Sequence, residues 1–251
     1  MTRRRFFAPP GAFDANAKIV SLAGDESRHL RDVLRLSRGD EVFVFDGQGH
    51  EYQCVVDDFG RDSSTLRLID EVEPASPESP LKLTLAVALL KGEKFDLLVQ
   101  KATELGVLRV VPVITTRADV RLRDSADAQK RVMRWQRIAL EAAKQSGRAL
   151  VPEVSSPTDF ASLLVDQKIA GARRIMFSEK GGTPLQETPL TGPPADITAL
   201  VGSEGGWADE ELAQARNAGW RIVTLGGRTM RAETAAIAVT VVLQHLYGDL
   251  K

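Results

Sequence analysis

The feature that most restricts the fold is the alternation of apolar runs with helical patterns that begins after Pro80. Residues 83–90 form a continuous apolar run, which is typical of a strand buried on both faces. The segment 94–105 has helical spacing and is followed by Gly106, a good helix stop. Further strands are expected at 110–114, 174–177, 197–201 and 221–225, and further helices at 127–146, 208–218 and 233–247. Strands that alternate with helices predict a mainly parallel α/β sheet.

Residues 1–73 have a different pattern, because short β-type runs separated by turn signals replace the long helices. The runs lie at 41–46, 52–56 and 64–69, and one helix is expected from about Ser27 to Leu36. Closely spaced strands of this kind predict a small β-barrel domain. The proline-rich residues 74–81 are expected to be a linker, which leaves residues 82–251 as the second domain.

Charge and cysteine content exclude several classes of protein. The single cysteine, Cys54, permits no internal disulfide or cysteine-based metal cage, and the three histidines show no ligand spacing. No apolar run is long enough to span a membrane, and the N-terminus lacks the apolar stretch of a signal peptide. The sequence therefore predicts a cytoplasmic, metal-free protein. Because the formal net charge is −1, any binding of nucleic acid must depend on local basic patches.

Three expected strands are followed by loops of unusual composition, at 177–182, 202–207 and 225–235. In open parallel sheets, ligands bind beyond the carboxyl ends of the strands. Glycines in such loops let the backbone approach a ligand closely. A single glycine-rich loop is often only a turn, but three loops at one edge of a sheet favour a ligand site. The chain has no G-x-G-x-x-G, P-loop or G-x-S-x-G motif, which disfavours the usual dehydrogenases, kinases and hydrolases.

Basic residues recur at helical spacing in two places. Arg28, Arg31, Arg35 and Arg38 would share one face of a helix that continued so far, and the helix at 127–146 carries a second stripe. Such stripes are usually only solvated faces, although they could contact RNA. The N-terminal arginines at 3–5 precede two phenylalanines that could stack on bases or lie in the barrel core.

Together these motifs resemble the RsmE family, the 16S rRNA uridine-N3 methyltransferases of the SPOUT superfamily. The resemblance covers essentially the whole chain, and several long motifs occur in the right order. They are Arg4–Phe7, His29–Leu36, Gly39-Asp40, Lys91–Asp96, Gln100–Val107, Arg137–Ala139, Glu141–Arg148, Gly202–Trp207 and Arg231–Ala235. Three places depart from the family pattern: Ser203 replaces a proline, Gly227, Thr229 and Met230 alter the next loop, and Ala118 stands where a serine is common.

The resemblance implies a fold and a function that spacing alone does not show. The N-terminal barrel would be PUA-like and bind RNA, and the C-terminal domain would be a SPOUT-type α/β domain with a trefoil knot. The three loops would hold S-adenosylmethionine in a bent shape. The enzyme would act as a homodimer on 16S rRNA of the small ribosomal subunit.

The site residues expected on this basis fall into three groups. Cofactor-binding residues are Phe177, Ser178, Val201, Gly202, Glu204, Gly205, Gly206, Leu225, Gly226, Arg228, Met230 and Ala232. Candidate catalytic residues are Arg231, Glu233 and Glu204. Candidate RNA-binding residues are Arg4, Arg5, Arg28, Arg31, Arg35, Arg137, Lys144 and Arg148.

The expected chemistry centres on an imide N–H that stays protonated at neutral pH. Methylation of N3 needs that proton removed or the developing O2/O4 charge stabilised, and Arg231 is the candidate for the second role. Glu233 or Glu204 could act as a base or could orient Arg231, and the sequence does not separate these roles. Two other functions stay open: a related knotted enzyme that methylates a ribose 2′-hydroxyl or another base, and a non-catalytic RNA-binding or assembly protein.

Overall fold

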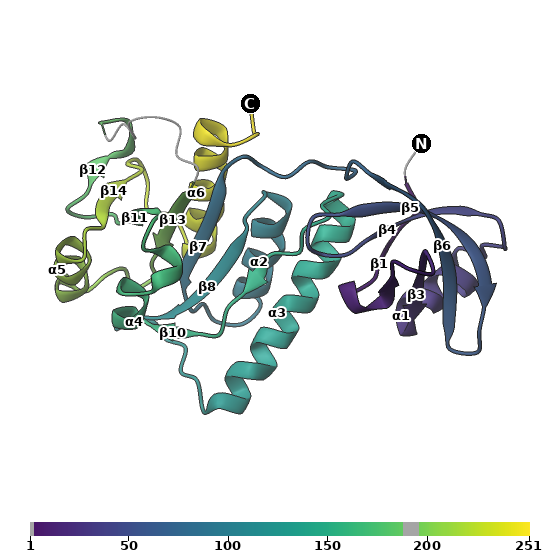
Figure 1. Ribbon diagram of the computed structural model, residues 1–251. Coiled ribbons are helices and arrows are strands. Elements are labelled where there is room, and N and C mark those ends of the chain that lie inside the picture. Colours follow the sequence, from purple (N-terminus) through teal and green to yellow (C-terminus); the bar gives the residue numbers. More distant parts are fainter. Residues whose placement is uncertain (1–2, 188–195) are drawn as a thin grey trace. The chain divides into compact units, whose positions relative to one another are not determined.

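A computed structural model describes residues 3–187 and 196–251 of the chain (Figure 1). The chain forms two compact units, and each is described by itself. Unit 1 comprises Met1–Glu78 and Ala143–Val151, and unit 2 comprises Ser79–Ala142 and Pro152–Lys251. The division 1–73, 74–81 and 82–251 stays a prediction. The sequence pattern gave no sign that residues 143–151 join the N-terminal unit.

Unit 1 is built on a curled six-stranded sheet around one apolar core. The strands lie in the order β1 (Arg5–Phe7), β4 (Glu41–Phe45), β5 (Glu51–Phe59), β6 (Ser63–Val72), β3 (Ile19–Ala23) and β2 (Phe13–Asp14). Alternate residues of these strands point inward, so that Val42, Val44, Cys54 and Leu66 are fully buried. Of the two N-terminal phenylalanines, Phe6 is buried in this core and Phe7 is half-buried, so the core alternative holds for Phe6.

The expected helix at 27–36 begins and ends about three residues earlier than predicted. The structure has α1 (Gly24–Arg28) followed by a π-helical turn at His29–Val33. Arg35 then adopts a left-handed backbone with φ of 52°, which is incompatible with a continuing helix. The prediction that Arg35 and Arg38 extend one helical face is therefore wrong.

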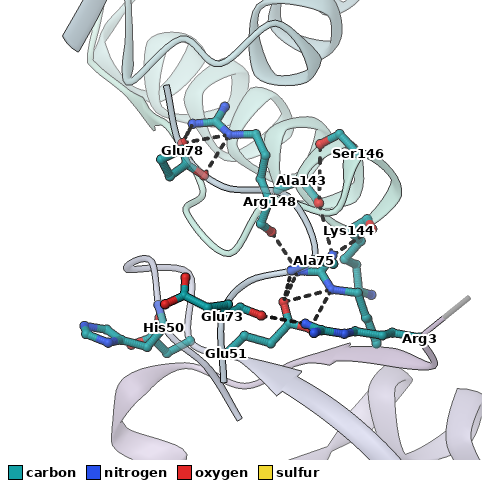
Figure 2. A network of polar contacts seen from close by, with 12 residues as sticks. Arg3, His50, Glu51, Glu73, Ala75, Glu78, Ala143, Lys144, Ser146 and Arg148 are labelled. Carbon is teal, nitrogen blue, oxygen red and sulfur yellow. Dashed lines mark hydrogen bonds and ion pairs between the residues drawn. The ribbon is translucent and has the colours of Figure 1, made fainter. Parts of the chain in front are cut away.

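A buried network of charges holds the N-terminal strand of unit 1 (Figure 2). The Glu51 carboxylate is fully buried and accepts hydrogen bonds from Arg5 Nη2 at 3.0 Å, Arg3 Nη1 at 3.1 Å and the Ala75 amide at 3.1 Å. Arg5 also donates to the carbonyl oxygens of Lys144 at 3.1 Å and Arg148 at 3.0 Å. These carbonyls lie at the C-terminal end of α3 (Ser125–Ser146) and just beyond it, where a cation is favourable.

Replacing Glu51 with alanine is expected to destabilise the protein by roughly 3–5 kcal/mol, because it leaves buried arginine charge without its carboxylate. Urea unfolding followed by circular dichroism measures the loss. Glu41→Ala is the matched control. This exposed carboxylate on β4 accepts a hydrogen bond from Gln53, and the structure gives its side chain no other contact among the described residues. Equal stability of the two variants would contradict a structural role for the network.

Unit 2 contains an eight-stranded sheet in which every pairing is parallel, as predicted. The order is β10 (Thr158–Asp159), β8 (Arg109–Ile114), β7 (Lys82–Ala88), β13 (Asp196–Val201), β11 (Arg173–Phe177), β14 (Arg221–Thr224) and β12 (Thr183–Pro184), with β9 (Glu153–Val154) pairing with β8. The central strand β7 reads as a continuous apolar run because its side chains are buried on both faces. The short strands β9, β10 and β12 were not expected from the sequence.

Helices cover the sheet of unit 2 (Figure 1). They are α2 (Lys94–Glu104), α4 (Phe160–Leu164), α5 (Asp209–Asn217) and α6 (Ala232–Tyr247), with the first part of α3. Phe160, Leu163 and Leu212 pack with Met176 and Leu200 in one core cluster. α6 contacts β7, β13 and α2. Within the described ranges, no helix is both long and apolar enough to cross a bilayer.

The strand order decides where the three predicted loops meet. β11 lies between β13 and β14, with Phe177 in register with both Val201 and Val223. These strands are separated in sequence, but they run parallel, so their carboxyl ends lie at one edge of the sheet. The loops that follow them therefore converge, as the sequence analysis expected.

Candidate active site

A cavity of about 290 Å³ opens at the carboxyl ends of β11, β13 and β14. Its walls come from all three predicted loops and from the first turns of α6. The lining residues are Phe177, Ser178, Glu179, Lys180, Val201, Gly202, Ser203, Gly206, Trp207, Thr224, Leu225, Gly226, Gly227, Arg228, Thr229, Met230, Ala232, Ala235 and Val239. All the residues predicted to bind the cofactor are among them except Glu204 and Gly205.

Trp207 fixes the first two loops to each other. Its indole Nε1 donates a hydrogen bond of 2.8 Å to the carbonyl oxygen of Phe177, and its ring lies against Gly202. A Cβ atom at position 202 would lie 3.0 Å from Trp207 Cε2, so only glycine fits without a shift. Trp207 therefore ties its own loop to the end of β11.

Replacing Gly202 with alanine is expected to weaken S-adenosylmethionine binding roughly tenfold to a hundredfold. Overpacking costs about 1–3 kcal/mol, and here that cost falls on the indole that joins two walls of the cavity. Calorimetric titration of the donor measures the change. Gly171→Ala is the control, since no atom would lie within 4 Å of its new Cβ. An unchanged dissociation constant for Gly202→Ala would contradict this role.

The outer side of the 202–206 loop packs against Arg117, in the segment after β8. Ser203 Oγ donates to the Arg117 carbonyl at 3.2 Å, and Arg117 Nη1 donates to the Gly205 carbonyl at 3.3 Å. A Cβ at Gly205 would lie 2.9 Å from the Arg117 carbonyl oxygen, so the backbone of this loop approaches Arg117 as closely as only glycine allows. The hydroxyl of Ser203, one of the departures from the family pattern, therefore makes a contact that a proline could not make.

The loop between β14 and α6 contains a second departure with a structural consequence. Gly226 and Gly227 both have left-handed backbones, with φ of 70° and 79°. Proline holds φ near about −65°, so a proline at position 227 could not adopt this conformation. The left-handed backbone at position 227 therefore excludes proline and favours glycine.

The predicted catalytic residues gather beside the cavity. Arg231 is the N-cap residue of α6 and is exposed, and Glu233 lies in the first turn of the same helix. Glu204 forms a hydrogen-bonded ion pair with Lys94, the first residue of α2. Lys94 Nζ is also 3.7 Å from Glu233 Oε2. Neither carboxylate is among the residues that line the cavity.

The ion pair shifts the pKa values of both Glu204 and Lys94. The hydrogen bond from Lys94 lowers the pKa of Glu204 below its ordinary value. The pKa of Lys94 is raised, chiefly by the same hydrogen bond, and the nearby Arg231 charge opposes that rise. The lowered pKa makes the Glu204 carboxylate a weaker proton acceptor, which disfavours its use as a general base.

Sequence reasoning missed several residues of this region. Lys94 was noticed only as part of a family motif, and nothing in its own segment indicated its acidic partners. Ala235 and Val239 line the cavity together with Ala232. Their spacing of three and four places all three residues on one helix face, a signal that could have identified them.

The predicted RNA-binding residues divide into internal and exposed groups. Arg5 and Arg148 are buried, and Arg148 pairs with Glu78 at 2.6 Å. Lys144 pairs with Glu26 within unit 1. The exposed or partly exposed members are Arg4, Arg28, Arg31 and Arg35 in unit 1 and Arg137 in unit 2. No cluster of metal-binding side chains occurs in the part of the chain that the structure describes.

Comparison with known families finds a matching domain model for the N-terminal and for the C-terminal part of the chain. Residues 77–244 match the model of an RNA methyltransferase domain, and residues 22–69 match that of an RNA methyltransferase PUA domain. The ribosomal RNA small subunit methyltransferase E of Synechocystis is 34% identical over 94% of this chain and 75% of its own length. The Bacillus subtilis enzyme of the same name is 30% identical, over 93% of this chain and 94% of its own.

Solved structures agree with this assignment. The ribosomal RNA small subunit methyltransferase E of Neisseria gonorrhoeae, bound to S-adenosylmethionine, has a TM-score of 0.87 and 32% identity over the whole of both chains. A methyltransferase of Legionella pneumophila, also solved with S-adenosylmethionine, has a TM-score of 0.86 and 29% identity over the whole of both chains.

A PUA domain joined to a parallel α/β domain with a cavity at its strand ends defines an RNA methyltransferase of the S-adenosylmethionine-dependent class. The chain belongs to the ribosomal RNA small subunit methyltransferase E family. This membership confirms the family, the class of fold and the class of enzyme that the motifs predicted.

Proposed function

We propose that this protein transfers a methyl group from S-adenosylmethionine to N3 of one uridine in the 16S RNA of the small ribosomal subunit. The observation that carries the proposal is the single cavity formed by the three strand-end loops, beside an exposed arginine at a helix N-terminus. The names of the relatives indicate small-subunit ribosomal RNA as the substrate. The resemblance of the motifs to the family indicates N3 of uridine as the methylated atom.

The cavity suits the methyl donor in size and lining. Its volume of about 290 Å³ lies near the lower end of the ~300–1,000 Å³ typical of small-molecule pockets, as expected for a ligand folded on itself. Gly202, Gly206 and Gly226 leave backbone groups open to the ligand, and Phe177 and Met230 offer apolar contact. When bound, S-adenosylmethionine would supply an electrophilic methyl group on its sulfonium.

The protein's own contribution is charge stabilisation and positioning. As N3 loses its proton, negative charge spreads over the O2 and O4 atoms of the uracil ring. The Arg231 guanidinium, together with the positive end of α6, is placed to stabilise that charge. The two carboxylates pair with Lys94, so we assign the proton to solvent and not to Glu204 or Glu233. The uridine must be unpaired or flipped out to be reached.

RNA contact is proposed for the arginines that are exposed or partly exposed, which are Arg4, Arg28, Arg31, Arg35 and Arg137. A homodimer is supported by large apolar side chains that are exposed on two helices of unit 2 that pack together, Leu97 on α2 and Val241 and Leu246 on α6. Sedimentation velocity of the purified protein tests the dimer. We also propose that unit 2 contains a trefoil knot. We propose a cytoplasmic location for the protein, because small subunits are assembled there.

The test incubates the protein with labelled S-adenosylmethionine and one of two substrates. These are small subunits from cells that lack this activity, and naked 16S RNA from the same cells. Nucleoside mass spectrometry should find the label in 3-methyluridine, and the two RNA preparations show which substrate is preferred. Label in a 2′-O-methyl nucleoside or in another base would assign a different methyltransferase activity. RNA binding without donor affinity would identify a non-catalytic protein.

A further inference from the structure

One lysine lies between the two carboxylates that sequence analysis placed in the reaction. Lys94 Nζ donates to Glu204 Oε1 and lies 3.7 Å from Glu233 Oε2. The side chain of Glu233 is only 13% exposed, against 43% for Glu204. Within the described residues, Glu233 Oε2 is shielded from solvent and accepts no hydrogen bond. Lys94 is therefore the cation that compensates a shielded carboxylate atom.

The three residues come from separate segments next to the cavity. Glu204 lies between Ser203 and Gly206, which line the cavity, and Glu233 follows Ala232, which also lines it. Lys94 opens α2, which packs against α6. The lysine thus ties the loop after β13 and the start of α6 to a third element.

Arg231 lies next to this cluster and needs a free guanidinium for the role proposed above. It is the N-cap residue of α6, two residues before Glu233. Its positive charge is close enough to Lys94 to lower the pKa of that lysine. Over residues 3–187 and 196–251, Arg231 has no ion pair that the structure records, although two carboxylates are near. An arginine beside a shielded, uncompensated carboxylate would be drawn to it, because a buried charge that lacks a partner is costly.

We propose that Lys94 is a positioning residue for methyl transfer: its ammonium neutralises Glu233 and Glu204 and so keeps the Arg231 guanidinium available to the uridine. The inference rests on the proposed function. Because Lys94, Glu204 and Glu233 do not line the cavity, donor binding should depend on them little.

The kinetic test compares Lys94→Met with wild-type enzyme. We expect kcat to fall about tenfold to a hundredfold, as for a misplaced catalytic group, while KM for the donor changes less than about threefold. Lys94→Arg should restore most of the rate. Lys94→Met/Glu233→Gln should recover part of the activity lost in Lys94→Met, because the more shielded of the two carboxylates is then neutral. A merely structural lysine predicts no recovery in the double variant, and that result would overturn the inference.

A crystal structure of Lys94→Met tests the inference without any activity measurement. The Arg231 guanidinium should move to within 4 Å, the limit for an ion pair, of a Glu233 or Glu204 oxygen. An Arg231 that keeps its position and lacks a carboxylate partner would refute the proposal. This readout stays decisive even if wild-type protein transfers no methyl group to RNA, which would refute the proposed function instead.

Discussion

Replacing Arg231 with alanine is expected to lower the rate of methyl transfer about 10²- to 10³-fold, the loss typical of removing one group that stabilises transition-state charge. The affinity for S-adenosylmethionine should stay nearly unchanged. Arg231 is exposed at the start of α6 and is not among the residues that line the cavity. Single-turnover transfer to RNA gives the rate, and calorimetry gives the donor affinity.

Two further variants define what the arginine supplies. Arg231→Lys keeps the charge but loses the planar fork of donors, so it should retain part of the rate. Arg221→Ala is the matched control, because this exposed arginine begins β14 at the end opposite the cavity, and its rate should equal that of the wild type. Equal losses of rate and donor affinity in Arg231→Ala would reassign Arg231 to donor binding.

Replacing Ala235 with phenylalanine is expected to weaken donor binding by at least about a hundredfold, since displacing a ligand group from a filled pocket costs several kcal/mol and each 1.4 kcal/mol is about tenfold. Ala235 lies on the cavity side of α6, and a phenyl ring there would occupy part of a space of only about 290 Å³. Titration calorimetry with S-adenosylmethionine measures the affinity.

The neighbouring residue offers a matched control for this substitution. Thr234 is exposed on the same helix and is not among the cavity-lining residues, so Thr234→Phe should bind the donor as the wild type does. Thermal unfolding of both variants shows whether α6 remains folded. Wild-type affinity in a folded Ala235→Phe would place the donor elsewhere.

Much of unit 2 could be predicted because local patterns determine it. The continuous apolar run of β7 and the helical spacing of α2 are properties of single segments, and their bounds agree with the prediction within two residues. The meeting of the three loops could also be predicted, because parallel strands bring their carboxyl ends to one edge. Glycine-rich loops at three such ends then marked the cavity.

Contacts between distant segments could not be predicted. Arg5 and Arg148 resemble surface cations in the sequence, yet their partners Glu51 and Glu78 lie 46 and 70 residues away along the chain. Lys94 finds Glu204 at a separation of 110 residues. No local pattern records such pairs, so the sequence showed neither the internal partners of Arg5 and Arg148 nor the ion pair of Lys94.

The departures from the family pattern gain a physical meaning from the fold. Ser203 bonds to the carbonyl oxygen of Arg117, the residue that precedes the buried Ala118. Ser203 thus contacts the residue next to Ala118, which is another of the altered positions. Gly227 has a backbone conformation that is closed to proline. The sequence alone showed these changes only as losses of family residues.

A crystal structure of the protein with S-adenosylmethionine tests the central claim most directly. We predict density for the donor inside the cavity, between Phe177, Gly202 and Gly226, with its methyl group directed toward the side on which Arg231 lies. Donor bound outside these three loops, or a cavity that stays empty at saturating donor concentration, would contradict the assignment of this site.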